Sequence, residues 1–332
     1  MSCIENINRY ITPNDVINTL MNIYKYIGKN ESYVEITKGS TTKILEQTVQ
    51  RDAFFLAKIL NLDISDSRLR LIITKNSTPR NREETILFNI IEVLNDIQMN
   101  YGAYNIRSND QLNLINYIFQ NKNIKYDNKE EGLFKNKSKR LYLDELTEVL
   151  YDKNTNIEKI ILSLNYFVDV FNIKAFTDQN KTSALITLYI LLLKSELQCF
   201  LYISFFELVY EKFNDFNGKL FDSSYNWHEG VAQPTPFIRF MVNLILDACE
   251  KAEKIIYDYK VDQNISKGDN IEHTINRLPN IFTKEQIRMI HPYVSESTIN
   301  RALQKLRDED KIKPLGKGRS AKWRKNNNSN IF

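Results

Sequence analysis

The chain has 332 residues, of which 42% are hydrophobic, and a formal net charge of +4. This length allows two domains, each with its own core. Only 9 glycines and 7 prolines interrupt the chain, which favours an α-rich protein with few tight turns. A surplus of four positive charges is too small to indicate a nucleic-acid-binding protein by itself, so the distribution of charge must decide.

Cysteine usage and the longest apolar run exclude further classes of protein. Cys3, Cys199 and Cys249 are far apart and form no CxxC pair, so we expect neither a disulfide framework nor a cysteine-rich zinc site. The first ten residues lack the apolar segment of a signal peptide. The apolar run 184–193 is about half of the ~20 residues that a membrane span needs. We therefore expect a cytoplasmic protein with no membrane partner.

Helical spacing of apolar residues recurs along most of the chain. The pattern in 15–27 ends at Gly28, and the pattern in 80–99 is strongly amphipathic. A short strand is predicted at 32–36, followed by a second helical pattern. Further helices are predicted over 105–120, 141–150, 156–171, 204–220 and 234–257.

The stretch 171–195 organises the chain. It reads FNIKAFTDQNKTSALITLYILLLKS, so that six polar residues, Thr177 to Thr182, precede the apolar run. Short polar side chains in this place indicate a helix start, because they can accept hydrogen bonds from the first N–H groups. The run is apolar nearly all round, which predicts the central helix of a bundle. A helix start flanked by Asp178 and Asn180 also suits an anion or a metal-chelated phosphate.

This stretch resembles the signature of Fic-domain proteins, His-x-Phe-x-Asp/Glu-Gly-Asn-Gly-Arg-x-x-Arg. Phe176, Asp178 and Asn180 match it. The catalytic His position holds Lys174, and the other departures are Gln179 and Lys181 at the two Gly positions and Thr182 and Leu185 at the two Arg positions. The resemblance covers about 80–254 and implies a Fic-like helical core.

The resemblance also assigns roles to these residues. In active Fic proteins the His deprotonates a target hydroxyl, which attacks the α-phosphate of ATP, and the acidic residue binds magnesium. It thus implies magnesium at Asp178 and nucleotide at Asn180, Lys181 and Thr182. A lysine, such as that at position 174, is a poor general base because its pKa starts near ~10.4. The two added side chains stand where the family exposes bare backbone to phosphate. We expect a catalytically impaired pocket that still binds ATP and magnesium, or else a simple helix cap.

Two other segments resemble Fic features. Thr42–Gln47 is similar to the inhibitory motif Ser/Thr-x-x-x-Glu-Gly/Asn, which makes Glu46 inhibitory by ancestry. Its expected partner position holds Leu185, so that salt bridge cannot form, and the alternative is a Glu that favours the helix macrodipole. The interval 121–139 occupies the place of the family's small β-hairpin flap, with Gly132–Lys135 similar to Gly-x-Tyr/Phe-Arg. A solvated, lysine-rich loop is the alternative there.

The C-terminal part resembles a winged helix-turn-helix. A short helix over 283–289 precedes a second helix over 296–307 with Ser295 as its N-cap, and Gly316–Gly318 makes a hairpin wing. The segment 311–325 has seven Lys and Arg residues and no acid, a local density that suits phosphate binding. The alternative is a module for protein contact only. The predicted DNA-binding residues are Ser297, Thr298, Arg301, Lys305, Lys317, Arg319 and Lys322.

Together these patterns predict a mainly α protein in three parts. We expect an N-terminal helical region over 1–79, a degenerate Fic core over 80–260, a linker within 261–270, and a winged helix over 271–325. His228, His273 and His291 are expected to be surface or structural residues. The leading hypothesis is a DNA-binding regulator. The alternatives are an AMP-transferring enzyme with a divergent site, or an interaction protein whose flap (122–135) captures a partner strand. A homodimer is left open.

Overall fold

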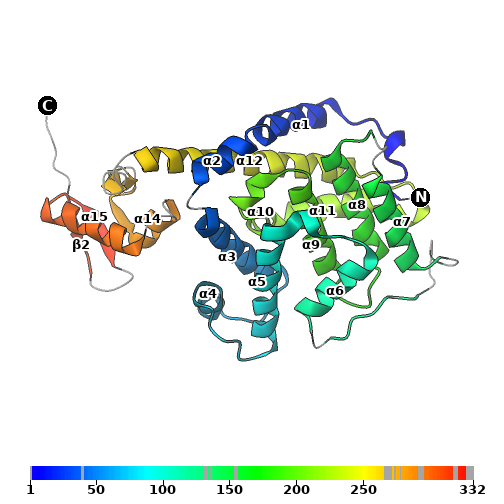
Figure 1. Cartoon of the computed structure of the whole chain (residues 1–332), viewed down its shortest axis with the longest axis horizontal. Helices are drawn as coiled ribbons and strands as arrows, with labels where there is room; N and C mark the ends of the chain where they lie inside the picture. Colours follow the sequence, from blue (N-terminus) through cyan, green and yellow to red (C-terminus); the bar gives the residue numbers. More distant parts are fainter. Residues whose placement is uncertain are drawn as a thin grey trace. The chain divides into compact units, whose positions relative to one another are not determined.

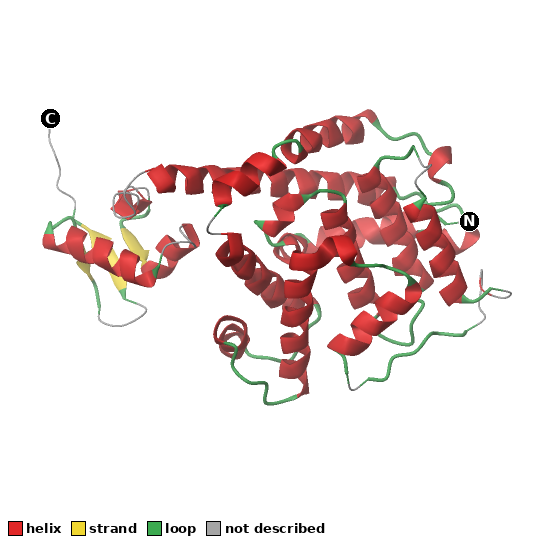
Figure 2. Cartoon of the chain, viewed as in Figure 1, coloured by secondary structure: helices red, strands yellow, loops and turns green. Residues whose placement is uncertain are grey.

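The computed structural model describes residues 2–38, 41–120, 122–129, 134, 137–152, 156–264, 271–272, 274–276, 278–290, 295–316 and 321–326, with the backbone alone for 260–264 and 289–290. Helices make up most of the described chain (Figures 1 and 2), which confirms the mainly α prediction. The chain divides into two compact units. The first consists of Met1–Asn30 and Thr48–Glu253, and the second of Glu31–Gln47 and Lys254–Phe332.

The first unit is a helical bundle. Short 3-10 turns lie at Ile7–Arg9, Tyr101–Ala103, Gln198–Leu201 and Trp227–Glu229. Its helices are α1 (Asn14–Ile27), the later part of α3 (Thr41–Ile59), α4 (Asp66–Lys75), α5 (Arg82–Asn100), α6 (Ser108–Ile118), α7 (Lys139–Tyr151), α8 (Lys159–Ile173), α9 (Asn180–Lys194), α10 (Phe205–Glu211), α11 (Phe213–Ser224) and most of α12 (Thr235–Asn264).

Helix α9 is the central helix that the sequence predicts. Every residue from Thr182 to Leu193 is buried, because the run is apolar on all faces and neighbouring helices cover each of them. It packs against α6 and α8 inside the bundle (Figure 1). Each buried Leu or Ile contributes about 1.5–3 kcal/mol relative to an exposed one. The start of α9 is therefore held in a fixed place.

A buried carboxylate on α8 anchors two loops. Asp169 accepts hydrogen bonds from the backbone N–H of Cys3 at 2.7 Å and of Ile4 at 2.9 Å, and from Trp227 Nε1 at 2.7 Å. Burial raises the pKa of this carboxyl to about 6. Three donors compensate part of the cost of burying the carboxylate, so the N-terminal segment and the turn at Trp227 are fixed on the bundle.

The second unit contains the one sheet of the described residues. Strands β1 (Ile281–Thr283), β2 (Ile312–Pro314) and β3 (Lys322–Lys325) are antiparallel in the order β1-β3-β2, and α14 (Lys284–Ile290) and α15 (Glu296–Asp308) lie between β1 and β2 in the chain. The hairpin predicted around 316–318 is confirmed by the pairing of β2 with β3. The core of this part is Ile271, Ile275, Phe282, Ile287, Ile299, Ala302, Leu303, Leu306, Ile312 and Trp323.

Three sequence predictions of secondary structure are wrong. Residues 32–36 lie in helix α2 (Asn30–Thr37), not in a strand: Tyr33 and Thr37 are buried four residues apart, while Val34 is half exposed. The first four residues of the predicted linker, 261–264, continue α12. The predicted helix over 204–220 is broken at Lys212 into α10 and α11. No described helix combines the length and apolar character that a membrane span requires.

Candidate functional site

The turn between α8 and α9 carries the residues that resemble the Fic signature. Helix α8 ends at Lys174, which has the left-handed backbone with φ of 48°, and Gln179 precedes α9 with φ of 59°. Positive φ is the conformation that glycine adopts most readily. Gln179 stands at a family Gly position, so this chain keeps the bend there and adds a side chain to it.

Asn180 closes the turn on itself. Its Oδ1 accepts a hydrogen bond from the backbone N–H of Phe176 at 2.9 Å, and its Nδ2 donates to the carbonyl of Phe176 at 2.6 Å. Phe176 is buried, so the amide satisfies both backbone groups of a buried residue. The side chain predicted to bind nucleotide therefore has a structural role.

Asp178, the predicted magnesium ligand, is engaged by the chain itself. Its Oδ2 accepts from Lys122 Nζ at 2.8 Å, and its Oδ1 accepts from the backbone N–H of Gln179 at 2.7 Å. The Lys122 hydrogen bond is the main cause that lowers the pKa of Asp178. Magnesium at nucleotide sites is usually held by one or two carboxylates together with phosphates. Asp178 is the carboxylate at this turn, and it is already paired with Lys122.

The side chains at the remaining signature positions, 181, 182 and 185, pack against or hydrogen-bond to other parts of the chain. Lys181 Nζ lies 4.5 Å from the centre of the Phe213 ring, and burial lowers the pKa of this lysine. Thr182 is buried, and its hydroxyl donates to Gln179 Oε1 at 3.0 Å. Leu185 is buried where the family has its second Arg. The turn thus has neither of the two arginines of the signature.

No histidine stands at this turn in the described residues. Lys174 is exposed, and its side chain has no hydrogen bond or ion pair to any described residue. His228 lies in the turn 227–229, where its ring packs edge-on against Trp227 at 5.1 Å between centres. His273 and His291 lie outside the described residues. The described residues of this turn are joined by hydrogen bonds that involve the side chains of Asp178, Asn180 and Thr182.

The segment that corresponds to the flap is extended and pairs with the same turn. Tyr126 forms an isolated antiparallel bridge with Phe176. The N–H of Asp127 donates to the carbonyl of Ala175 at 2.8 Å, and the N–H of Thr177 donates to the carbonyl of Lys125 at 2.9 Å. Among the described residues of the interval 121–139, this pairing is a single bridge. Gly132, Leu133 and Lys135 lie outside the described part of the chain, and Phe134 is buried.

The inhibitory-like residue belongs to the other unit. Glu46 is exposed on α3, in the stretch 31–47 that is part of the second unit, whereas Leu185 is buried in the first. Glu46 and Leu185 therefore belong to different compact units.

Helix α15 displays the predicted polar face. Ser295 caps it by accepting from the N–H of Thr298 at 3.2 Å, and the buried face is Ile299, Ala302, Leu303 and Leu306. Ser297 and Arg301 are exposed, and Lys305 is exposed with Glu309 at 3.9 Å. Thr298 is half-buried, and its hydroxyl lies 2.8 Å from that of Ser295.

Strand β3 has a buried tryptophan between two exposed basic residues. Trp323 is buried, while Lys322 and Arg324 on either side of it are exposed, and Arg324 is paired in register with exposed Lys313 on β2. None of these three cations has an acidic partner among the described residues. By contrast, two basic residues of the same segment are engaged: Lys311 pairs with Glu272 and Glu309, and Lys325 donates to backbone carbonyls. Lys317 and Arg319 lie outside the described residues.

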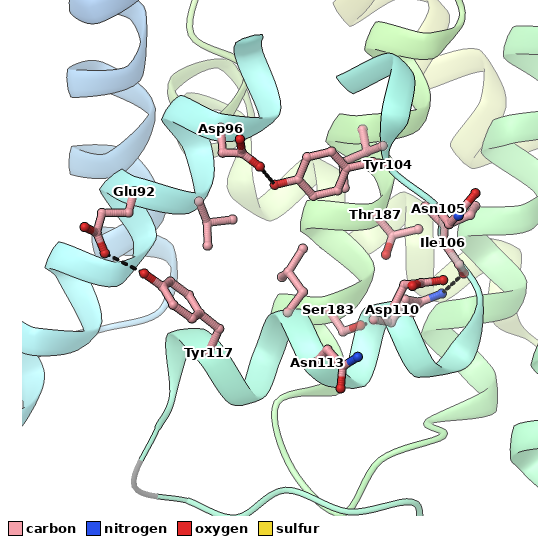
Figure 3. Close-up of a pocket in the computed structure, with 14 residues that line it drawn as sticks. Glu92, Asp96, Tyr104, Asn105, Ile106, Asp110, Asn113, Tyr117, Ser183 and Thr187 are labelled. Atoms are coloured by element: carbon pink, nitrogen blue, oxygen red, sulfur yellow. Dashed lines mark hydrogen bonds between the residues drawn. The ribbon is translucent and has the colours of Figure 1, made fainter. Parts of the chain in front are cut away.

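A cavity that the sequence does not indicate lies between α5, α6 and α9 (Figure 3). Its volume is about 510 Å³. Its polar lining residues include Glu92, Asp96 and Asp110, and the buried hydroxyls of Ser183 and Thr187 reach it from α9. Finding it requires the relative placement of three helices that are distant in sequence. No single motif marks it.

Comparison with known proteins supports one statement about fold. No protein-family model and no curated protein matches the sequence. Among solved structures, the chain is similar to a Fic family protein from Desulfovibrio desulfuricans G20, with a TM-score of 0.54 over 97% of this chain and 99% of that chain. Only 15% of the residues are identical. The fold is thus Fic-like, while the shared identity is too low to carry an activity across.

Proposed function

We propose that this chain is a Fic-like protein that has lost nucleotide transfer and acts as a DNA-binding regulator, with 271–325 as a winged helix-turn-helix. The observation that carries the proposal is the set of exposed, unpaired cations that the structure describes on α15 and β3 of the second unit. Arg301 on α15, and Lys322 and Arg324 on β3, are exposed and have no acidic partner among the described residues. A protein cation that pairs with a DNA phosphate releases the counterion of that phosphate, and this release favours binding. A cation without an acidic partner can do so without first breaking an ion pair.

The element order supports the same proposal. A helix in the major groove reads base edges through side chains near its N-terminus, and a basic wing adds phosphate contacts. Helix α15 presents Ser297 and Arg301 on the face opposite its buried leucines, and the hairpin of β2 and β3 follows it directly. Arginine on such a face pairs with guanine O6 and N7. The proposal includes Lys317 and Arg319 as wing contacts.

The turn before α9 supports the proposed loss of transfer activity. General-base catalysis needs a group whose pKa lies near the working pH within reach of the target hydroxyl. Lys174 holds the place of that group, Asp178 is paired with Lys122, and Asn180 is used by the backbone of Phe176. Since the one carboxylate of this turn is paired with Lys122, no step through a metal-bound nucleotide is proposed.

DNA binding is tested by fluorescence anisotropy with a labelled duplex of random sequence. We expect the full chain to bind, and Arg301→Ala/Lys322→Ala to weaken binding by about tenfold or more, since each lost contact costs ~1 kcal/mol. The matched control Lys159→Ala/Lys219→Ala removes the same charge from exposed ion pairs of the first unit. Equal losses in both double variants, or no binding by the wild type, would contradict the proposal.

Transfer activity is tested separately by incubation with ATP labelled at the α-phosphate, magnesium and a cell lysate. The proposal predicts no labelled protein. Labelling that disappears in Asp178→Ala but persists in Asp222→Ala, a matched exposed carboxylate, would support the AMP-transferring alternative instead. DNA binding and transfer thus fail independently.

A further inference from the structure

The cavity between α5, α6 and α9 has the size of a small-molecule site. Its volume of about 510 Å³ falls within the ~300–1,000 Å³ typical of ligand pockets. All of its lining residues come from the first unit and from described parts of the chain. The apolar side chains of its wall are Val93, Ile106, Leu114 and Ile190. Such a wall suits an apolar ligand body.

The polar part of the wall is acidic. Glu92 and Asp96 enter from α5, and Asp110 enters from α6 on another side of the cavity (Figure 3). None of the described residues that line the cavity is Lys, Arg or His. Three carboxylates without a compensating cation attract a positive ligand and repel a phosphate.

Two tyrosines hold two of these carboxylates in place. Tyr117 donates its hydroxyl proton to Glu92 Oε2 at 2.7 Å, and Tyr104 donates to Asp96 (Figure 3). An ionised carboxylate has about four acceptor positions, so one such bond fixes it without exhausting it. Asp110 accepts no hydrogen bond from any described residue. The carboxylates therefore keep acceptor capacity for a ligand.

One side chain of α9 points to a ligand independently of the charges. Thr187 is 4% exposed, lines the cavity, and makes no side-chain hydrogen bond to any described residue. One helical turn earlier, Ser183 donates to Gln111 Oε1 at 3.0 Å, so its hydroxyl is satisfied. Buried polar side chains normally have partners, and the Thr187 hydroxyl is not one of the fully enclosed atoms without a partner, so it is accessible from the cavity. The Thr187 hydroxyl is placed to bond a group inside the cavity.

We propose that this cavity binds a small organic cation, an amine carried on an apolar body. The ammonium pairs with Asp110 through a charge-assisted hydrogen bond, while Glu92 and Asp96 add negative potential from the α5 side of the cavity. The body lies against the apolar wall, with Thr187 bonding a polar atom. This site is separate from the turn before α9 and from the second unit, so it does not rest on the proposed DNA binding.

Three probes that share one apolar body test the charge selectivity. 4-Phenylbutylamine, 4-phenylbutan-1-ol and 4-phenylbutanoate differ at the head group only, and binding to the full chain is measured by calorimetry and by ligand-observed NMR. We expect the amine to bind at least about tenfold more tightly than the alcohol and the carboxylate not to bind. Equal affinity for the three, or no amine binding at millimolar concentration, would overturn the proposal.

Substitutions in the cavity wall then test where the ammonium group binds. Glu92→Gln and Asp110→Asn keep the shape and the acceptor oxygen but remove the charge. Asp110→Asn should weaken the amine about tenfold, and Glu92→Gln, which removes a more distant charge, should weaken it less. Glu211→Gln removes an exposed carboxylate of α10 outside the cavity wall and should leave the affinity unchanged. Thr187→Leu fills the cavity and should abolish binding of amine and alcohol alike. Should that variant unfold, the two charge variants still decide. Unchanged amine affinity in both of them would refute the site.

Discussion

Raising the pH from about 5 to about 8 should destabilise the first unit, because the folded chain holds a proton on Asp52. This carboxyl is fully buried beside α9. It accepts hydrogen bonds from Ser204 Oγ at 2.6 Å, from Phe206 N–H at 3.1 Å and from the hydroxyl of Tyr189 at 3.4 Å. Burial outweighs these bonds and raises the pKa of Asp52 from 3.8 to about 7.

The sign and size of the effect follow from linkage. A carboxyl whose pKa is higher in the folded state binds its proton more tightly when folded. The resulting stability is complete below the unfolded pKa and is lost as the pH rises through the folded pKa. With one pKa unit worth 1.36 kcal/mol, the change for Asp52 between these two pH values is about 2–3 kcal/mol. Asp169, with its pKa raised to about 6, adds about 1 kcal/mol in the same direction.

Urea unfolding followed by circular dichroism at the two pH values measures this change. Asp52→Asn keeps the size of the side chain and an acceptor oxygen but cannot ionise, so its free energy of unfolding should fall less than that of the wild type by about 2–3 kcal/mol. Asp222→Asn, an exposed carboxylate in a surface ion pair, is the matched control. Wild type and Asp52→Asn with the same pH dependence would refute the reasoning.

Two further substitutions test the packing that positions the sites. Asn180→Ala leaves the N–H and carbonyl of buried Phe176 without partners and should lower the free energy of unfolding by about 2–4 kcal/mol. Asn243→Ala, which removes an exposed amide that donates to a helix carbonyl, should cost less, and equal losses would contradict this. Ser295→Ala removes the cap of α15 and should cost about 1 kcal/mol in thermal unfolding of the second unit, with the exposed Ser297→Ala as a neutral control.

Local sequence patterns predict those elements whose burial is decided locally. The apolar run after Thr182 specifies α9 because no face of such a helix tolerates water, and the spacing of Ile299, Ala302, Leu303 and Leu306 predicts α15. Residues 32–36 mislead because Val34 and Ile36 favour strands, whereas the buried pair Tyr33 and Thr37 has helical spacing. Which of these residues are buried is decided only when the helix packs in the folded unit.

The candidate sites depend more strongly on contacts between distant residues. The sequence places Asp178 and Asn180 in one turn, yet it does not show that Lys122 pairs with Asp178, because these two residues lie 56 positions apart. The cavity is invisible for the same reason, since its acidic side chains on α5 and α6 meet Thr187 only in the folded bundle. Residue identity predicts what a side chain can do, but the fold decides whether it is already engaged.

The most direct test of the account is the salt dependence of DNA affinity for the full chain. Binding through unpaired cations should give a linear fall of log affinity with log salt concentration, and Lys322→Ala/Arg324→Ala should reduce the slope by about 2, one unit for each lost phosphate contact. Lys159→Ala/Lys219→Ala should leave the slope unchanged. A slope near zero in the wild type, or one that Lys322→Ala/Arg324→Ala does not alter, would contradict DNA binding by the second unit.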